Sequence, residues 1–298
     1  MPMKEKIKIE DIRNWWNNNS YSYGINSTAG YKDTGIPKFL EEEKVFTEYE
    51  RKYRKHLVES FDQKSRPAGK FIPYDYLNGK NVLDVASGLG WASINMARSG
   101  AIVTGIDLTP NAISFSERYA KSEGLRINFI EMSAEELKFD DSCFDFVLGW
   151  GFLMHTENPE VALNELIRVC RPGGKVVLYF YYMHSVTFWF NIFFLRGLLK
   201  GQLIKYRGSL LKLVSRNTDG DSFGGNMRTE VLSRKWFRNH IDGSYNVEMI
   251  FQGWGPPSLL DNFPISKVPL GRFMPYKFKK IFSDRFGFGH ILTINRLN

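Results

Sequence analysis

The sequence contains only two cysteines, Cys143 and Cys170, among its 298 residues. Two cysteines in apolar patterns do not form a disulfide framework, so we expect both to be buried free thiols. The chain opens without a charged segment followed by an apolar stretch, and it contains no internal repeat or low-complexity tract. These absences argue against a disulfide-stapled secreted domain and against a repeat protein, and they predict a cytoplasmic location.

Long hydrophobic runs are also missing. The stretch SVTFWFNIFFLRGLL, residues 185–199, is strongly apolar, but Asn191 and Arg196 interrupt it. A bilayer-spanning helix needs about 20 predominantly apolar residues, so this stretch is too short and too broken to span a membrane. We expect a buried or interfacial helix here.

Acidic residues are scarce in the last part of the chain. Residues 183–298 carry 17 Lys/Arg and 7 Asp/Glu, a net charge of +10, whereas residues 1–182 carry 23 and 25, a net charge of −2. This asymmetry indicates either an anionic partner, such as a phosphate-bearing substrate, a membrane surface or nucleic acid, or a solvated basic surface. FWFNIFFLRGLLKGQLIKYRGSLLKL resembles a basic amphipathic helix that rests on an anionic membrane; the alternative is a subdomain packed on the core.

Strand and helix patterns alternate between residues 81 and 182. Apolar runs such as NVLDVA, AIVTGID and KVVLYFYY predict strands, and amphipathic stretches such as PNAISFSERYAKSEG and PEVALNELIRVC predict helices between them. RPGG, residues 171–174, is typical of a turn, and NVEMIFQGWG and GHILTINRL predict two late strands. The pattern predicts an α/β fold with a doubly wound, mainly parallel seven-stranded Rossmann-like sheet.

The segment after the first predicted strand has the composition of a cofactor loop. Asp84, at the end of the strand, is followed by two glycines, Gly88 and Gly90, and Asp107 ends the second strand 23 residues later. Ligands of such sheets bind beyond the carboxyl ends of the strands, and an acid about 20 residues on is the usual partner of ribose hydroxyls. A nicotinamide dinucleotide requires GxGxxG, which the sequence from Ala86 does not supply. An acid at the strand end instead suits a cationic ligand, such as a sulfonium with an ammonium group.

Four motifs in order resemble the class I S-adenosylmethionine-dependent methyltransferases, in particular the small-molecule branch similar to the ubiquinone and menaquinone biosynthesis enzymes. The motifs are VLDVASGLG, GIDLTPNAISFSERYA, MSAEELKFDDSCFDFVLGWGFLMH and ALNELIRVCRPGGKVVL. The resemblance covers roughly residues 75–182 and implies S-adenosylmethionine as the cofactor. It further implies four regions: an N-terminal helical lid (1–70), a donor-binding core (71–182), an acceptor-covering insert (183–240) and C-terminal strands that complete the sheet (241–298).

The resemblance also implies which residues bind the donor. Ala86 replaces the first glycine of the family's loop, and because alanine tolerates positive φ poorly we expect it to keep a negative φ. Tyr21 and Tyr23 are candidates for the donor carboxylate within the lid, with simple anchoring of a helix as the alternative. The remaining expected contacts are Asp84, Ser87, Gly88 and Gly90 at the methionine part, Asp107 at the ribose, Leu108, Ser133, Ala134 and Glu135 at the adenine, and Trp150 and Gly151 beside the methyl sulfonium.

His155 is the candidate catalytic residue. It follows the fourth predicted strand, where related enzymes often carry a histidine near the methyl group, and it could act as a general base; the alternative is a structural histidine. His184 is a second candidate, and we expect no metal. The sequence therefore predicts methyl transfer to a small-molecule acceptor, anionic or lipid-linked, at a hydroxyl or phenol oxygen. An RNA methyltransferase and a non-catalytic S-adenosylmethionine-binding protein remain alternatives.

Overall fold

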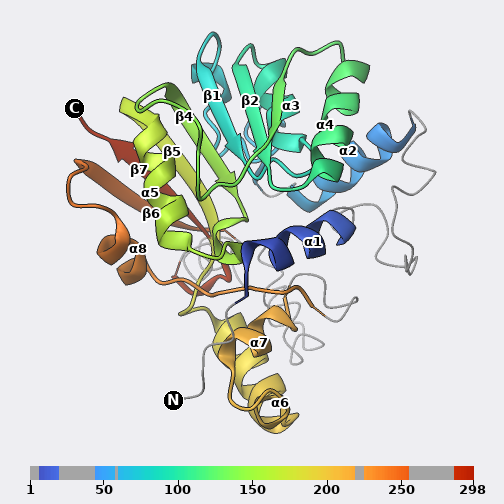
Figure 1. Cartoon of the computed structure of the whole chain (residues 1–298), viewed down its shortest axis with the longest axis vertical. Helices are drawn as coiled ribbons and strands as arrows, with labels where there is room; N and C mark the ends of the chain where they lie inside the picture. Colours follow the sequence, from blue (N-terminus) through green and yellow to red (C-terminus); the bar gives the residue numbers. More distant parts are fainter. Residues whose placement is uncertain (1–6, 20–43, 58–59, 219–224, 255–284) are drawn as a thin grey trace.

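A central sheet of seven strands organises the chain, with helices on both of its faces (Figure 1). The computed structural model describes residues 7–19, 44–57, 60–218, 225–254 and 285–298. The strand order is β3-β2-β1-β4-β5-β7-β6. In chain order the strands are β1 (Asn81–Val85), β2 (Ile102–Asp107), β3 (Asn128–Glu131), β4 (Phe144–Trp150), β5 (Cys170–Tyr181), β6 (Val247–Trp254) and β7 (Gly289–Arg296).

The predicted doubly wound, mainly parallel sheet is confirmed. Strands β1 to β5 pair in parallel, and β7 pairs antiparallel with both β5 and β6. The chain starts in the middle of the sheet, moves outward to β3 and returns to β4 on the other side of β1. The order therefore reverses between β1 and β4, where ligands of open α/β sheets bind.

Alternate residues of the central strands enter different cores. In β1, Val82 packs in a cluster with Met96 of helix α3, whereas Leu83 packs in a cluster with Leu163 of helix α5. All four side chains are completely buried, because successive side chains of a strand point to opposite faces and helices cover both. The helices around the core are η3 (Tyr74–Tyr76, 3-10), α3 (Trp91–Arg98), α4 (Pro110–Ser122), η4 (Leu153–His155, 3-10), α5 (Pro159–Val169) and α8 (Arg234–His240).

The beginning of β5 differs from the sequence prediction. Residues 171–174 were predicted as a turn, but β5 already begins at Cys170. A register shift against β4 between Phe144 and Phe146 accommodates these residues, and Gly173 adopts a φ of +78°. Glycine tolerates that conformation without strain, so these turn-forming residues form an irregular first part of the strand.

The two cysteines are free thiols, as predicted. Cys170 is buried, but Cys143 is only half-buried, in contrast to the expectation. Cys143 lies directly before β4 and follows the Asp141–Ser142 turn, in which Asp141 is exposed.

Two α-helices precede the sheet in the described residues. They are α1 (Ile9–Asn19) and α2 (Lys44–Leu57). Phe46, Tyr49 and Tyr53 of α2 pack in one apolar cluster with residues of α4. The lid function of residues 1–70 and the boundaries of the four regions stay predictions.

A helical lobe follows β5. It comprises the π-helix η5 (Thr187–Leu199), α6 (Gln202–Lys205) and α7 (Leu210–Ser215), and it has a small apolar core of its own. The lobe lies at the end of the molecule away from β1 and β2 (Figure 1). Tyr182 forms a single parallel bridge with Leu232, which returns the chain to the sheet. None of the helices described is both long enough and apolar enough to cross a membrane.

Candidate active site

A cavity of about 300 Å³ lies at the carboxyl ends of the central strands. Its wall includes the residues that end or follow β1, β2 and β4, namely Ala86, Asp107 and Trp150, and Tyr179 near the end of β5. Parallel strands present their carboxyl ends at one edge of a sheet, so four loops converge on this space.

The turn after β1 is held in a left-handed conformation. Ala86 has a φ of +54° and Gly88 a φ of +54°, so the prediction that Ala86 keeps a negative φ is wrong. Two backbone bonds explain this: the Ser87 N–H donates to the Ile106 carbonyl (2.8 Å), and the Gly90 N–H donates to the Ser87 carbonyl (2.9 Å). These bonds fix the turn despite a cost of roughly 1–2 kcal/mol for an alanine in this region.

The turn leaves room and a polar group for a ligand. A Cβ at Gly88 would meet no atom within 4 Å, whereas a Cβ at Gly90 would lie 2.9 Å from the Ser116 hydroxyl. The hydroxyl of Ser87 is buried in the cavity wall and has no hydrogen-bond partner among the residues that the structure describes. Because buried polar groups are normally paired, this hydroxyl fits a polar atom of a bound ligand.

Asp107 places a carboxylate at the end of β2, in the cavity wall. Its Oδ1 accepts bonds from the Thr109 N–H (2.9 Å) and hydroxyl (2.7 Å), and its Oδ2 accepts one from the Gly88 N–H (2.9 Å). Burial raises the pKa of Asp107, while these hydrogen bonds act in the opposite direction. The bonds fix both oxygens, so the carboxylate can accept further bonds from a pair of hydroxyls without rearranging.

Asp84 and Gly90 do not line the cavity, although both were expected to contact the donor. The Asp84 carboxylate is 2% exposed and accepts a 2.6 Å bond from the Ser93 hydroxyl in α3. Burial raises the pKa of Asp84 to about 7. The structure therefore gives Asp84 a position within the β1–α3 packing, and Gly90 serves as the left-handed N-cap of α3.

The loop after β3 forms another part of the wall. Ser133, Ala134 and Glu135 all line the cavity, as does Leu108. The Glu135 carboxylate accepts bonds from the backbone N–H groups of Glu157 (2.7 Å) and Asn158 (3.1 Å). These groups lie at the start of α5, where a carboxylate is favoured by the helix dipole. Glu135 thus links the loop to α5 as well as lining the cavity.

His155 lies in the cavity wall at the end of η4 and is buried. Its Nδ1 is 2.7 Å from the backbone carbonyl oxygen of Arg228, and a carbonyl can only accept. The proton of the neutral ring is therefore on Nδ1, and Nε2 carries the lone pair. Burial lowers the pKa of His155 to about 4, so the ring is neutral near pH 7. His184, the second candidate, is exposed and does not line the cavity.

The residues that orient His155 were not predicted from the sequence. Beside Arg228, the side chains of Asn226 (3.2 Å) and Thr229 (3.4 Å) approach its Nδ1. The Thr229 N–H donates to the hydroxyl of Ser215 in α7 (2.7 Å), so the lobe holds this segment in place. These residues lie about 60 to 74 positions from His155 in sequence, and no local pattern signals such a contact.

Helix α1 packs against the cavity. Ile12 and Trp16 line it, and the Trp16 ring lies 5.1 Å from the His155 ring in an edge arrangement. The Arg13 side chain donates to the Leu108 carbonyl (3.2 Å) and pairs with Glu131, which ties α1 to the ends of β2 and β3. Tyr21 and Tyr23 lie outside the described residues.

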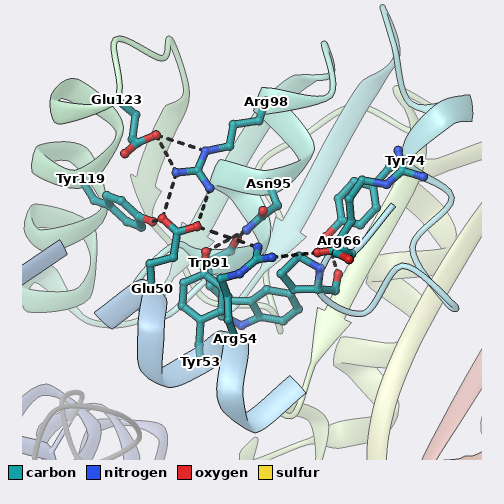
Figure 2. A network of polar contacts seen from close by, with 12 residues as sticks. Glu50, Tyr53, Arg54, Arg66, Tyr74, Trp91, Asn95, Arg98, Tyr119 and Glu123 are labelled. Atoms are coloured by element: carbon teal, nitrogen blue, oxygen red, sulfur yellow. Dashed lines mark hydrogen bonds and ion pairs between the residues drawn. The ribbon is translucent and has the colours of Figure 1, made fainter. Parts of the chain in front are cut away.

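Helix α2 supplies a further wall, which an ionic network holds against α3 and α4. Figure 2 shows Arg98 between Glu50 and Glu123, and Tyr119 bonded to Glu50. The nitrogen–oxygen distances from Arg98 to Glu50 and Glu123 are 3.1 and 2.6 Å. The Asn95 amide donates to the Tyr53 hydroxyl (3.0 Å), which positions that ring beside Trp91. The aromatic lining residues Tyr49, Tyr53, Trp91, Phe152, Tyr179 and Tyr181 were not predicted from the sequence.

The cavity wall is aromatic and lacks cationic side chains in the part of the chain that is described. The Trp150 ring stacks on Tyr179 (5.3 Å) and meets Trp91 edge-on (5.5 Å), and Gly151 beside it also lines the cavity. Asp107 and Glu135 are the acids of this wall, and no lysine or arginine of the described chain belongs to it. Aromatic faces and carboxylates favour a ligand with cationic character.

These features fit S-adenosylmethionine. The unpaired Ser87 hydroxyl, the open space at Gly88 and the fixed carboxylate of Asp107 match the polar groups of a nucleoside bearing an amino-acid chain. The aromatic wall suits a sulfonium. Among the described residues no group of three or more His, Cys, Asp or Glu could hold a metal ion.

Comparisons with known proteins agree with this fit. Residues 83–178 match the family described as "Methyltransferase domain". An uncharacterized protein of Mycobacterium tuberculosis is 41% identical over 98 residues, which are 33% of this chain and 36% of that protein. The ubiquinone biosynthesis O-methyltransferase of Coxiella burnetii is 32% identical over 124 residues, covering 37% and 53% of the two chains. The matches thus span about a third to a half of these relatives' lengths.

Solved structures share the fold at low sequence identity. The magnesium protoporphyrin IX methyltransferase of Synechocystis superimposes with a TM-score of 0.53 at 14% identity and covers 96% of this chain and 97% of its own. An S-adenosylmethionine-dependent methyltransferase of Methanosarcina mazei gives a TM-score of 0.51 at 20% identity, covering 77% and 96%.

Proposed function

We propose that the protein is a class I S-adenosylmethionine-dependent methyltransferase that methylates a hydroxyl or phenol oxygen of a small molecule; the match of residues 83–178 to the family described as "Methyltransferase domain" supports this. The observation that carries the proposal is the state of His155. Its proton is held on Nδ1 by the Arg228 carbonyl, and its burial keeps the ring neutral in the wall of the donor cavity. Nε2 therefore carries a lone pair, which a general base needs in order to accept a proton from the acceptor.

S-adenosylmethionine is the cofactor of this domain. When bound, it supplies a methyl group that is already activated on a sulfonium. Asp107 would accept bonds from the ribose hydroxyls, Ser133 and Ala134 would border the adenine, and Ser87 would bond the methionine part. The faces of Trp150 and Tyr179 would stabilise the positive charge of the sulfonium.

The chemical work that remains for the protein is alignment, exclusion of water and one proton transfer. Helices α1 and α2 and the aromatic rings enclose the cavity, so they restrict water at the reacting atoms. A hydroxyl acceptor loses its proton as oxygen attacks the methyl group, and His155 Nε2 takes that proton. The Arg228 carbonyl, which accepts the Nδ1 proton, keeps the ring oriented for this step, and Thr229 lies beside it.

The cavity wall favours an acceptor with an apolar or aromatic body. The described wall offers many rings and no lysine or arginine, so nothing in it would neutralise an anionic group on the acceptor. The basic charge of the C-terminal part lies outside this wall. The proposed acceptor is therefore a neutral hydroxylated or phenolic compound, and an anionic or lipid-linked portion would extend beyond the cavity.

Calorimetry and methyl-transfer assays test the proposal. S-adenosylmethionine should bind the wild type, and Asp107→Asn should weaken binding by at least about tenfold, because hydrogen bonds to charged groups contribute about 1.5–3 kcal/mol. A screen with labelled donor against phenols and other hydroxylated compounds should identify the acceptor class.

With that acceptor, His155→Gln should lower kcat by about 10²–10⁴ and leave donor binding within about twofold. His184→Gln, an exposed histidine, is the matched control and should change neither quantity. Full activity of His155→Gln would refute the base role. Donor binding without transfer to any acceptor would support a non-catalytic binding protein instead.

A further inference from the structure

The helical lobe carries a concentration of exposed apolar side chains. Thirteen large apolar residues of the described chain are exposed, and six of them fall between positions 189 and 210. Leu199 is 67% and Ile204 86% exposed. Scattered exposed apolar residues are normal, but a cluster of this kind marks an interaction site. The six residues are Trp189, Phe194, Leu198, Leu199, Ile204 and Leu210, which we call the apolar tip.

The apolar tip belongs to a lobe whose other apolar side chains already pack in a core. Phe188 and Ile192 of η5 form a buried core with Leu213 of α7. The exposed positions of η5 recur every four to five residues from Trp189 through Phe194 to Leu198 and Leu199, the spacing of one face of a π-helix. The helix ends with an i→i+5 bond from the Lys200 N–H to the Leu195 carbonyl (3.0 Å). Packing within the lobe therefore leaves the apolar tip exposed.

Positive charges are interspersed with the residues of the apolar tip along the chain. Residues 183–218 contain six Lys/Arg and no Asp/Glu. Lys200, Lys205 and Arg207 are exposed and alternate along the chain with Leu199 and Ile204. No ion pair joins these three cations to an acid of the described chain. The surface therefore combines unneutralised cations with aliphatic side chains.

This combination distinguishes between anionic partners. A nucleic acid would pair with the cations, but its polar phosphate surface would not bury Leu199 or Ile204. A bilayer with anionic lipids accommodates both the aliphatic and the cationic side chains. The aliphatic side chains enter the acyl boundary, Trp189 suits the interface, and the cations contact the headgroups. Since η5 is 13 residues long, the contact is peripheral.

From these observations we propose that the apolar tip docks the protein onto the surface of a membrane containing anionic lipids. The proposal does not depend on methyl transfer. It does have a consequence for the site, because Ser215 of α7 bonds Thr229, whose side chain lies 3.4 Å from His155. Phe288 likewise packs against the lobe core and stacks on Tyr181 of the cavity wall at 4.4 Å. Docking would hold the cavity close to a lipid surface, from which an apolar acceptor could enter.

Co-sedimentation of the full chain with vesicles tests the proposal. The protein should pellet with mixed phosphatidylcholine–phosphatidylglycerol vesicles at low salt, and high salt should weaken binding because it screens the cations. Pure phosphatidylcholine should bind it at least about tenfold less. Leu199→Asp combined with Ile204→Asp should lower the partition coefficient by at least about tenfold, because two aliphatic anchors no longer enter the bilayer.

Val161→Asp is the matched control, since Val161 is a 44% exposed apolar residue on α5; it should pellet like the wild type. S-adenosylmethionine binding by each variant reports an intact core, and its failure in the wild type would contradict the methyltransferase proposal without affecting this one. Absence of lipid-dependent pelleting in the wild type would overturn the docking proposal.

Two other results would also overturn it. In one, the double variant binds vesicles as well as the wild type. In the other, the wild type binds a single-stranded RNA rather than vesicles, and the double variant retains that binding, as a nucleic-acid surface would predict. A large loss of thermal stability in the double variant, without vesicle binding by the wild type, would show that the apolar tip is covered by the chain itself.

Discussion

Acidification tests the environment of His155 directly. The imidazole is buried, and desolvation lowers its pKa from the ordinary 6.5 to about 4, with the Arg228 carbonyl acting in the opposite direction. In the unfolded chain the same histidine binds a proton near pH 6.5. Between these two values the unfolded state holds more protons than the folded state. Stability from the buried neutral ring is therefore complete above pH 6.5 and is lost as the pH falls toward 4.

The size of the effect follows from the two pKa values. At pH 5.5 the linkage relation gives a loss of about 1.4 kcal/mol from this histidine relative to pH 7.5. His290 is also buried and has its pKa lowered to about 3, so it contributes a similar loss. Asp84 acts in the opposite direction, because its raised pKa of about 7 makes the folded state hold a proton more strongly. The contribution of one group to the pH dependence of stability is therefore obtained from the difference between its variant and the wild type.

Urea unfolding at the two pH values provides the measurement. Between pH 7.5 and 5.5, His155→Gln and His290→Gln should each lose about 1.4 kcal/mol less unfolding free energy than the wild type. His184→Gln, at an exposed position, should lose as much as the wild type. If His155→Gln and the wild type lose stability in parallel, the assigned environment of the ring is wrong. Activity offers a second check: kcat/KM should show no inflection near pH 6.5 from this residue.

Two further predictions concern the local structure of the site. Ala86→Gly should raise the melting temperature by about 1–3 °C, because glycine relieves the left-handed strain at φ +54° while losing little packing; a lower melting temperature in scanning calorimetry would argue against strain there. Arg98→Ala should reduce the unfolding free energy by about 1 kcal/mol at low salt and by less at high salt, because it breaks half-exposed ion pairs to Glu50 and Glu123. An equal loss at both salt concentrations would assign the effect of Arg98 to packing.

Local sequence patterns predicted most of the sheet. Each strand and helix from Asn81 to Tyr182 has its own hydrophobic period, and the loops after β1, β2 and β3 directly follow buried runs. Because parallel strands end at a common edge, Ser87, Asp107 and Ser133 could be placed together without coordinates. The start of β5 was missed, since a strand irregularity at residues 171–174 depends on register with β4 rather than on local propensity.

The site itself shows which features depend on the tertiary structure. The sequence determined the βα alternation and the cofactor loop, because hydrophobic period, glycine positions and strand ends are local properties. Burial, hydrogen bonds between distant segments and helix packing determined the loop conformation and the pKa and tautomer of the site residues. They force Ala86 into positive φ, turn Asp84 toward Ser93, and fix the proton of His155 through a carbonyl 73 residues away. Conformation, pKa and tautomer depend on atoms that only the folded chain brings together.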